Sequence, residues 1–133
     1  SNNDFTGAID LNKYFEVTIS PDNNAKLSLS LIEFVMQRSA TGPRQWSIRS
    51  SLDNFKTNIA SSVSNGNVRL TGDNIFQIAD RAYVSALSGN KLVLDNSFNN
   101  IVGSVSFRFY AYNAETTGGS FSLNSVRFDG KVE

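Results

Sequence analysis

The chain has 133 residues, the usual length of one domain, and we expect a single domain over residues 1–133. Its 12 Lys and Arg residues balance 12 Asp and Glu residues, so the net charge is zero, which argues against sequence-independent nucleic-acid binding. The chain contains no Cys and no His, which removes thiol chemistry, imidazole catalysis and most zinc, copper and haem sites. No apolar run approaches the roughly 18 residues of a membrane helix, so no membrane insertion is expected.

The first half of the chain shows a two-residue apolar period, which predicts β-strands. Residues 13–20 alternate cleanly, and residues 21–24 form a turn. A long strand follows over residues 26–38, and its apolar phase changes near Leu31. Such a change requires a β-bulge or a bend, because a slip of one residue would turn every later side chain outward. The same period resumes over residues 46–51.

The middle of the chain gives shorter strand signals, and the last third gives the clearest ones. Asn65-Gly66-Asn67 is a tight-turn signal of the kind that hairpins use. Residues 105–110 alternate over one strand, and residues 121–132 form a final strand whose phase changes near Ser125. Residues 75–82 form either a strand or a helical turn. The shorter apolar pieces cover residues 68–70, 75–78, 82–87 and 91–94.

Most of the polar residues in the chain are uncharged. It has nineteen Ser and sixteen Asn residues together with ten Phe and four Tyr, which favours strands joined by polar turns. We count roughly eight to ten short strands, and this spacing predicts an all-β sandwich or barrel. Surfaces rich in Ser, Thr and Asn often belong to secreted bacterial β-domains, so we expect a secreted or cell-surface protein.

Several segments together form a sequence signature that covers roughly residues 13–132. They are 13–19 (KYFEVTI), 38–43 (RSATGP), 46–55 (WSIRSSLDNF), 105–112 (VSFRFYAY) and 119–126 (GSFSLNSV). This signature resembles the jelly-roll modules of secreted and surface proteins of marine bacteria. The resemblance implies an antiparallel β-sandwich of jelly-roll type, a monomeric module of a larger multidomain protein, and a polysaccharide ligand, because such modules are similar in build to carbohydrate-binding modules.

Strand phase places several candidate ligand-binding residues outside the core. If Phe107 fills the interior, then Arg108, Tyr110 and Tyr112 project from the opposite face of the sheet, and Arg49 does the same on its own strand. Aromatic rings cover the apolar patches of a sugar ring, and guanidinium groups donate paired hydrogen bonds to hydroxyls, carboxylates or sulfates. The candidate set is Arg38, Trp46, Arg49, Arg108, Tyr110 and Tyr112.

The predicted function is therefore a non-catalytic carbohydrate-binding module for a polysaccharide, in particular an anionic or algal glycan. Structural interpretations stay open beside it. Arg38, Arg49 and Asp53 could form an ion-pair cluster that pins residues 39–45. The two tyrosines could be ordinary sandwich residues, and Trp46 could either pack in the core or stack on a ligand from a loop tip. The alternative function is a structural or adhesive spacer module of a bacterial cell-surface protein.

Carboxylates suggest two further possibilities. The resemblance implies one structural Ca²⁺ near the chain ends, and Glu16 in the first strand and Asp129 in the last are its candidate ligands, because these strands usually pair in jelly rolls. The alternative is that both carboxylates are simply solvated. A glycosidase needs two carboxylates that face each other across a cleft. The sequence shows no evident pair of this kind, so we expect that the protein is not an enzyme. Glu33, which lies among apolar residues, is the carboxylate that an enzyme would use.

Overall fold

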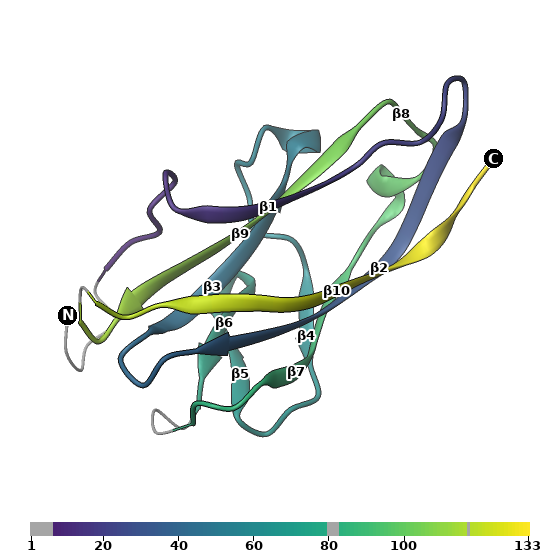
Figure 1. Cartoon of the computed structure of the whole chain (residues 1–133). Coiled ribbons are helices and arrows are strands. Elements are labelled where there is room, and N and C mark those ends of the chain that lie inside the picture. Colours follow the sequence, from purple (N-terminus) through teal and green to yellow (C-terminus); the bar gives the residue numbers. More distant parts are fainter. Residues whose placement is uncertain (1–6, 80–82, 117) are drawn as a thin grey trace.

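The computed structural model describes residues 7–79, 83–116 and 118–133, which form ten strands and three short 3₁₀ helices (Figure 1). No helix in these ranges has the length and apolar character that crossing a membrane requires. The strands are β1 (Tyr14–Ile19), β2 (Lys26–Arg38), β3 (Pro43–Ser50), β4 (Ser61–Val63), β5 (Val68–Thr71), β6 (Ile75–Ile78), β7 (Leu87–Val93), β8 (Ile101–Val102), β9 (Val105–Ala114) and β10 (Phe121–Val132). The helices are η1 (Ser51–Asp53), η2 (Gly72–Asn74) and η3 (Asn96–Phe98).

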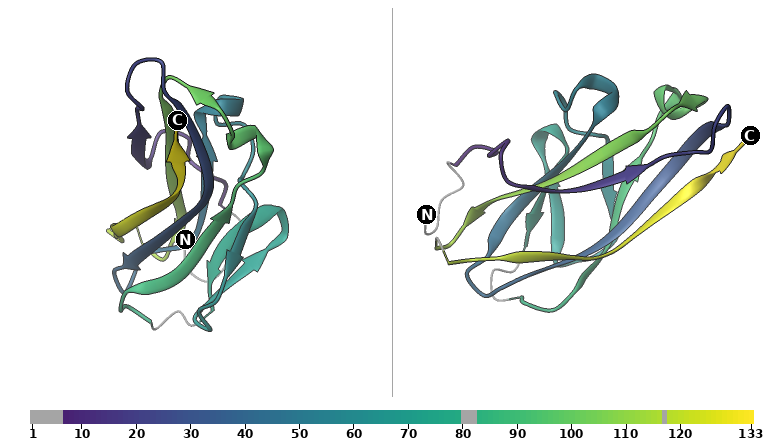
Figure 2. Two further views of the ribbon diagram at one scale, coloured as in Figure 1. Left: turned by 90° about the vertical axis from the view of Figure 1, so that its right-hand side faces the viewer. Right: turned by 45° about the horizontal axis from the view of Figure 1, so that its top comes forward.

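The strands form two sheets that pack face to face as a β-sandwich (Figure 2). The first sheet has the strand order β1-β9-β3-β6-β5, and the second has the order β10-β2-β7-β4, with β8 also paired to β2. Every strand pair in the two sheets is antiparallel. The predicted all-β antiparallel sandwich is confirmed, while its assignment as a jelly roll stays a prediction.

One apolar cluster with aromatic rings at its centre fills the space between the sheets. On β9, the alternate residues Val105, Phe107 and Phe109 are at most 2% exposed and point into this core. Phe34, which comes from β2 in the opposite sheet, meets Phe76 and Phe109 edge to face, with ring centroids 5.4 and 5.2 Å apart. Because alternate residues of a strand point to opposite faces, the intervening residues of β9 project outward.

Two β-bulges between β2 and β10 allow both strands to keep their apolar residues inside. The pairing register shifts by one residue at Ser30, between Leu29 and Leu31. This confirms the bulge or bend predicted near Leu31. A second shift leaves Asn124 unpaired next to Ser125, where the sequence predicted the other change of phase.

Gly130 lies beside the first bulge, where a side chain would collide with the backbone of β2. A Cβ atom on Gly130 would overlap the carbonyl oxygen of Ser28 and lie 3.1 Å from Leu29 Cα. We expect Gly130→Ala to lower the free energy of unfolding by about 1–3 kcal/mol, because no side-chain rotation relieves a clash with backbone atoms. Gly66→Ala is the matched control, since no atom lies within 4 Å of its added Cβ. Equal urea midpoints for the two variants would contradict this prediction.

The middle of the chain differs most from the sequence prediction. The tight turn at Asn65 is present, with the N–H of Val68 donating to its carbonyl at 3.0 Å. It joins β4 of the second sheet to β5 of the first, however, and not two paired strands of a hairpin. The short strand β4 was not expected. The strand predicted over residues 82–87 instead begins at Leu87 and continues to Val93, and Ala82 lies outside the described residues.

Candidate functional site

Alternate residues of β1, β3, β6 and β9 project from the first sheet away from the core. Four of them, Gln45, Ser47, Gln77 and Tyr110, are nevertheless buried and at most 7% exposed. The strand register aligns the projecting residues in three rows across the sheet. The rows are Glu16–Arg108–Arg49, Tyr14–Tyr110–Ser47 and Tyr112–Gln45–Gln77, and these nine residues define what we call the arginine–tyrosine face. Four of the six predicted ligand residues are therefore brought together, namely Arg49, Arg108, Tyr110 and Tyr112.

Arg108 is held on this face by one carboxylate and two aromatic rings. Its Nε donates a hydrogen bond of 2.8 Å to Glu16 Oε1. Its guanidinium carbon lies 4.2 Å from the centre of the Tyr14 ring and 3.8 Å from the centre of the Phe55 ring. The hydrogen bond to Glu16 raises the pKa of Arg108 above its already high ordinary value. The side chain is still 27% exposed, so solvent or a ligand can reach part of this charged group.

Arg49 attaches the loop after β3 to the arginine–tyrosine face. Its Nε donates to Asn58 Oδ1 at 2.8 Å, and its Nη1 donates to the carbonyl oxygen of Phe55 at 3.2 Å. Asn58 in turn donates from Nδ2 to the carbonyl oxygen of Asp73 at 2.9 Å. The guanidinium also lies over the Tyr110 ring, 5.9 Å from its centre. The loop after β3 therefore forms one wall of the face.

The hydroxyl of Tyr110 is buried without a hydrogen-bond partner in the described part of the chain. The residue is only 1% exposed, and its ring meets the Tyr14 ring edge to face at 5.5 Å. Glu16 contributes most to the raised pKa of Arg108, and the Tyr110 side chain contributes second. The Tyr110 hydroxyl and Arg108 nevertheless lack the geometry of a hydrogen bond. Burying an unsatisfied hydroxyl costs about 1–3 kcal/mol. Because the hydroxyl is buried, a ligand reaches it only if neighbouring side chains move.

The third row of the face carries amides and a phenol. The side chains of Gln45 and Gln77 hydrogen bond across β3 and β6 at 2.9 Å. The hydroxyls of Tyr112 and Ser47 hydrogen bond at 2.9 Å. Burial raises the pKa of Tyr112, so its phenol stays protonated at neutral pH. These groups both donate and accept hydrogen bonds, as the hydroxyls of a sugar do.

Arg38 lies away from the arginine–tyrosine face, which corrects the expectation that it shares one surface with the other arginines. It ends β2 in the second sheet, and its side chain is fully buried. Nε donates to the carbonyl of Pro43 and Nη2 to that of Gly42, both at 3.1 Å, and Nη2 pairs with Glu115 at 2.5 Å. Arg38 therefore pins the loop after β2 as expected, but its acidic partner is Glu115 and not Asp53, which bonds to Thr57 in its own turn. Arg49 is not part of this cluster.

Trp46 packs inside the core, which corrects its place on the predicted ligand surface. The side chain is 2% exposed and stacks on Phe76, with ring centroids 5.8 Å apart and the ring planes 2° from parallel. Its phase with Ile48, which is also buried, agrees with the core interpretation. The indole therefore presents no free face to a ligand.

The candidate calcium ligands, Glu16 and Asp129, lie on different sheets. β1 pairs with β9 and β10 pairs with β2, so the first and last strands do not pair as expected. Glu16 binds Arg108, while Asp129 and Glu33 both pair with Arg127, at 3.3 and 3.1 Å. Over residues 7–79, 83–116 and 118–133, no group of three or more acidic side chains could hold a metal ion. Calcium binding stays a prediction that this geometry does not support.

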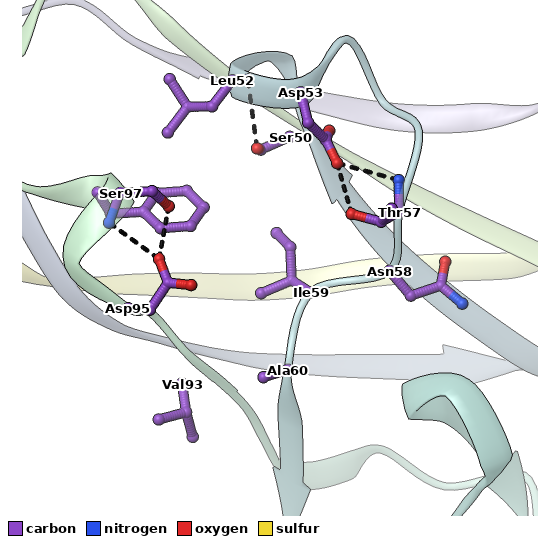
Figure 3. Close-up of a pocket in the computed structure, with 11 residues that line it drawn as sticks. Ser50, Leu52, Asp53, Thr57, Asn58, Ile59, Ala60, Val93, Asp95 and Ser97 are labelled. Carbon is purple, nitrogen blue, oxygen red and sulfur yellow. Dashed lines mark hydrogen bonds between the residues drawn. The ribbon is translucent and has the colours of Figure 1, made fainter.

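A separate hollow of about 230 Å³ lies beside the loop after β3, between η1 and η3 (Figure 3). Its two carboxylates close local turns, since Asp53 accepts from the N–H of Thr57 and Asp95 from that of Ser97. Burial opposes ionisation of Asp53, but hydrogen bonds, that of the Thr57 side chain first, lower its pKa. Hydrogen bonds from Ser97 lower the pKa of Asp95. Both carboxylates therefore stay charged at neutral pH, and their hydrogen bonds stabilise the turns in which they lie.

No family model, curated protein or solved structure that we compared with the chain matches it. The resemblance to jelly-roll modules of marine bacteria therefore stays a prediction.

Proposed function

We propose that this protein is a non-catalytic carbohydrate-binding module, secreted or displayed at a cell surface, whose polysaccharide ligand lies on the arginine–tyrosine face. The observation that carries the proposal is Arg108, a partly exposed guanidinium that Glu16 and the rings of Tyr14 and Phe55 hold in place on the same face as Arg49. Polysaccharides are dense in hydroxyl groups that both donate and accept hydrogen bonds. A ligand hydroxyl is therefore well suited to complete this site.

The other groups of the face also suit a sugar. The rings of Tyr14 and Phe55 offer apolar surface for the C–H groups of a pyranose. The partly exposed Tyr112 adds a phenol hydroxyl, whereas the amides of Gln45 and Gln77 are buried and bond to each other. Because all of these groups except Phe55 are carried by paired strands, their relative positions are set before a ligand arrives, which lowers the entropy that binding loses.

The charges of the face favour a neutral stretch of polysaccharide. Arg108 already pairs with Glu16 at 2.8 Å, and Arg49 is bound by the neutral oxygens of Asn58 and Phe55. An incoming carboxylate or sulfate would have to displace Glu16 or bind beside it, and like charges repel at short range. The anionic glycan that the arginine content suggested is the alternative ligand.

The carboxylates support a role in binding and not in catalysis. A glycosidase needs a carboxyl group with a raised pKa as its general acid. The pKa values of Asp53 and Asp95 are both lowered, since each carboxylate accepts hydrogen bonds within its own turn. Glu33 forms an ion pair with Arg127 on the second sheet, whereas the arginine–tyrosine face belongs to the first sheet.

Affinity electrophoresis against neutral, uronate-containing and sulfated polysaccharides tests this proposal. We expect at least one neutral polysaccharide to retard the protein, and Arg108→Ala to weaken that binding roughly tenfold or more, as the loss of a charged hydrogen bond predicts. Arg127→Ala is the matched control. Arg127 is also an arginine in an ion pair, but it lies on the second sheet and its side chain is 64% exposed. Its replacement should leave the retardation unchanged.

The alternative function, a structural or adhesive spacer module, would be favoured if no polysaccharide retards the protein. One feature speaks for it: both Arg49 and Arg108 already have partners within the chain, which a purely structural surface also requires. In a spacer, Arg108→Ala would lower the thermal stability and change no interaction with a glycan. Measuring both quantities on the same variant therefore separates the two functions.

A further inference from the structure

Phe55 contacts both arginines of the arginine–tyrosine face. Its ring centre lies 3.8 Å from the guanidinium carbon of Arg108, and its carbonyl oxygen accepts a hydrogen bond of 3.2 Å from Arg49 Nη1. The Tyr14 ring lies 4.2 Å from the same guanidinium carbon. Two rings cannot occupy the same space beside one carbon atom, so they pack against different sides of the guanidinium. One face of the Phe55 ring therefore rests on a cation that Glu16 holds in place.

The backbone at Phe55 adopts a conformation that aromatic residues rarely take. Its φ is 60°, in the left-handed region, and that of Asn54 is also 60°. Asn tolerates this region, whereas a bulky residue stays there only when the surrounding structure holds it. Here the N–H of Phe55 donates to the carbonyl of Ser50 at 2.9 Å, and Asp53 accepts from the two residues that follow Phe55. The loop thus holds the ring against Arg108 despite an unfavourable backbone.

The exposed part of the Phe55 ring faces solvent beside polar groups. Phe55 is only partly buried. Because Arg108 packs on one face of its ring, a ligand can approach the ring only from the opposite face or the edges. An aromatic ring of fixed orientation next to hydrogen-bond donors matches a pyranose, which presents C–H groups on its faces and hydroxyls around its rim.

We propose that Phe55 is the stacking platform of the arginine–tyrosine face, and that its exposed side receives the flat C–H face of one pyranose ring while the ring hydroxyls reach Arg49 and Arg108. This inference rests on the proposed function and narrows the ligand class. A pyranose whose hydroxyls are all equatorial keeps C–H groups on both faces, whereas an axial hydroxyl leaves only the opposite face apolar. The platform therefore favours neutral sugars with equatorial hydroxyls, which can stack through either face. Arg108 is then also a positioning residue, because its planar group fixes the orientation of the ring.

Calorimetric titration with soluble β-1,4-linked oligosaccharides of glucose, xylose, mannose and galactose tests the platform. We expect the glucose and xylose series to bind most tightly. Phe55→Ala and Phe55→Leu should each weaken that binding roughly three- to tenfold, and Phe55→Trp should preserve it. The leucine variant keeps apolar volume, so it separates stacking from packing even if the alanine variant unfolds. Leu52→Ala is the matched control, since Leu52 is 42% exposed in the same loop and has no aromatic ring that could stack on a sugar.

A double-mutant cycle with Arg108→Lys tests the positioning role. Lysine keeps the charge beside Glu16 but lacks the planar group on which the ring stacks. We expect Arg108→Lys to weaken binding less in the Phe55→Leu background than in the wild type. If Phe55→Leu binds as tightly as the wild type while Arg108→Ala does not, the platform is refuted and the proposed function stands. If the wild type binds no saccharide of either panel, both are refuted.

Discussion

Replacing Arg38 with methionine should lower the free energy of unfolding by about 3–5 kcal/mol, as expected when one partner of a buried ion pair is removed. The Arg38 side chain is fully buried and donates to the carbonyl oxygens of Pro43 and Gly42 and to the carboxylate of Glu115. Methionine has a comparable length but no donor. The two carbonyls therefore lose these hydrogen bonds, and Glu115 keeps its charge without this cation.

Urea denaturation of two further variants shows whether this loss comes from burial. Arg38→Lys keeps the charge but not the planar fork of donors, so its stability should lie between those of the wild type and the methionine variant. Arg127→Met makes the same replacement at a side chain that is 64% exposed, and it should change stability by no more than about 0.5 kcal/mol. A loss below about 1 kcal/mol for Arg38→Met would contradict the prediction and indicate that water replaces the lost donors.

Strand phase predicted the direction of side chains more reliably than their chemistry did. The sequence pattern assigned Arg38 to neither face, and its burial two residues after Met36 continues the inward phase of Phe34 and Met36. Trp46 likewise points inward with Ile48. Arginine and tryptophan are the residue types that sugar sites use, and that chemical argument placed both on the ligand surface. The alternation of a strand holds whatever the side chain is, and the protein satisfies the buried guanidinium with carbonyl oxygens.

Strand pairing was the part of the fold that phase could not predict. The two-residue period tells which face a side chain occupies, but not which strand lies beside it. Glu16 and Asp129 were expected to meet because first and last strands often pair, whereas these strands belong to different sheets. Arg49 and Arg108, by contrast, face each other directly across β3 and β9. Such long-range pairing is decided by the packing of the whole sandwich and by its loops.

The aromatic partners of Arg108 show the same limit of sequence patterns. Tyr14 lies in phase with Glu16 on the outer face of β1, so its direction was evident, but its contact with Arg108 depends on the pairing of β1 with β9. Phe55 belongs to a loop, where no period exists. Its position follows from two consecutive left-handed residues, Asn54 and Phe55, of which only Asn favours that conformation. No pattern in the sequence predicts that an aromatic residue adopts this conformation.

Truncating Trp46 to alanine should lower the free energy of unfolding by about 3–5 kcal/mol through the cavity that it leaves. The indole is 2% exposed and stacks on Phe76 between the two sheets. Its neighbours are carried by paired strands, which cannot move together to fill the space. Circular dichroism should follow the unfolding, because Trp46 is the only tryptophan in the chain and the variant has no indole fluorescence.

Trp46→Phe separates a role in the core from a role in ligand binding. The indole Nε1 has no hydrogen-bond partner in the described part of the chain, and burying such a donor costs about 1–3 kcal/mol. Phenylalanine removes this donor while it loses some volume, so the two effects oppose each other and the net loss should stay below about 1.5 kcal/mol. Its affinity for any polysaccharide that the wild type binds should be unchanged. A folded Trp46→Phe protein that lost this binding, while Arg108→Ala kept it, would place the ligand at the tryptophan and not on the arginine–tyrosine face.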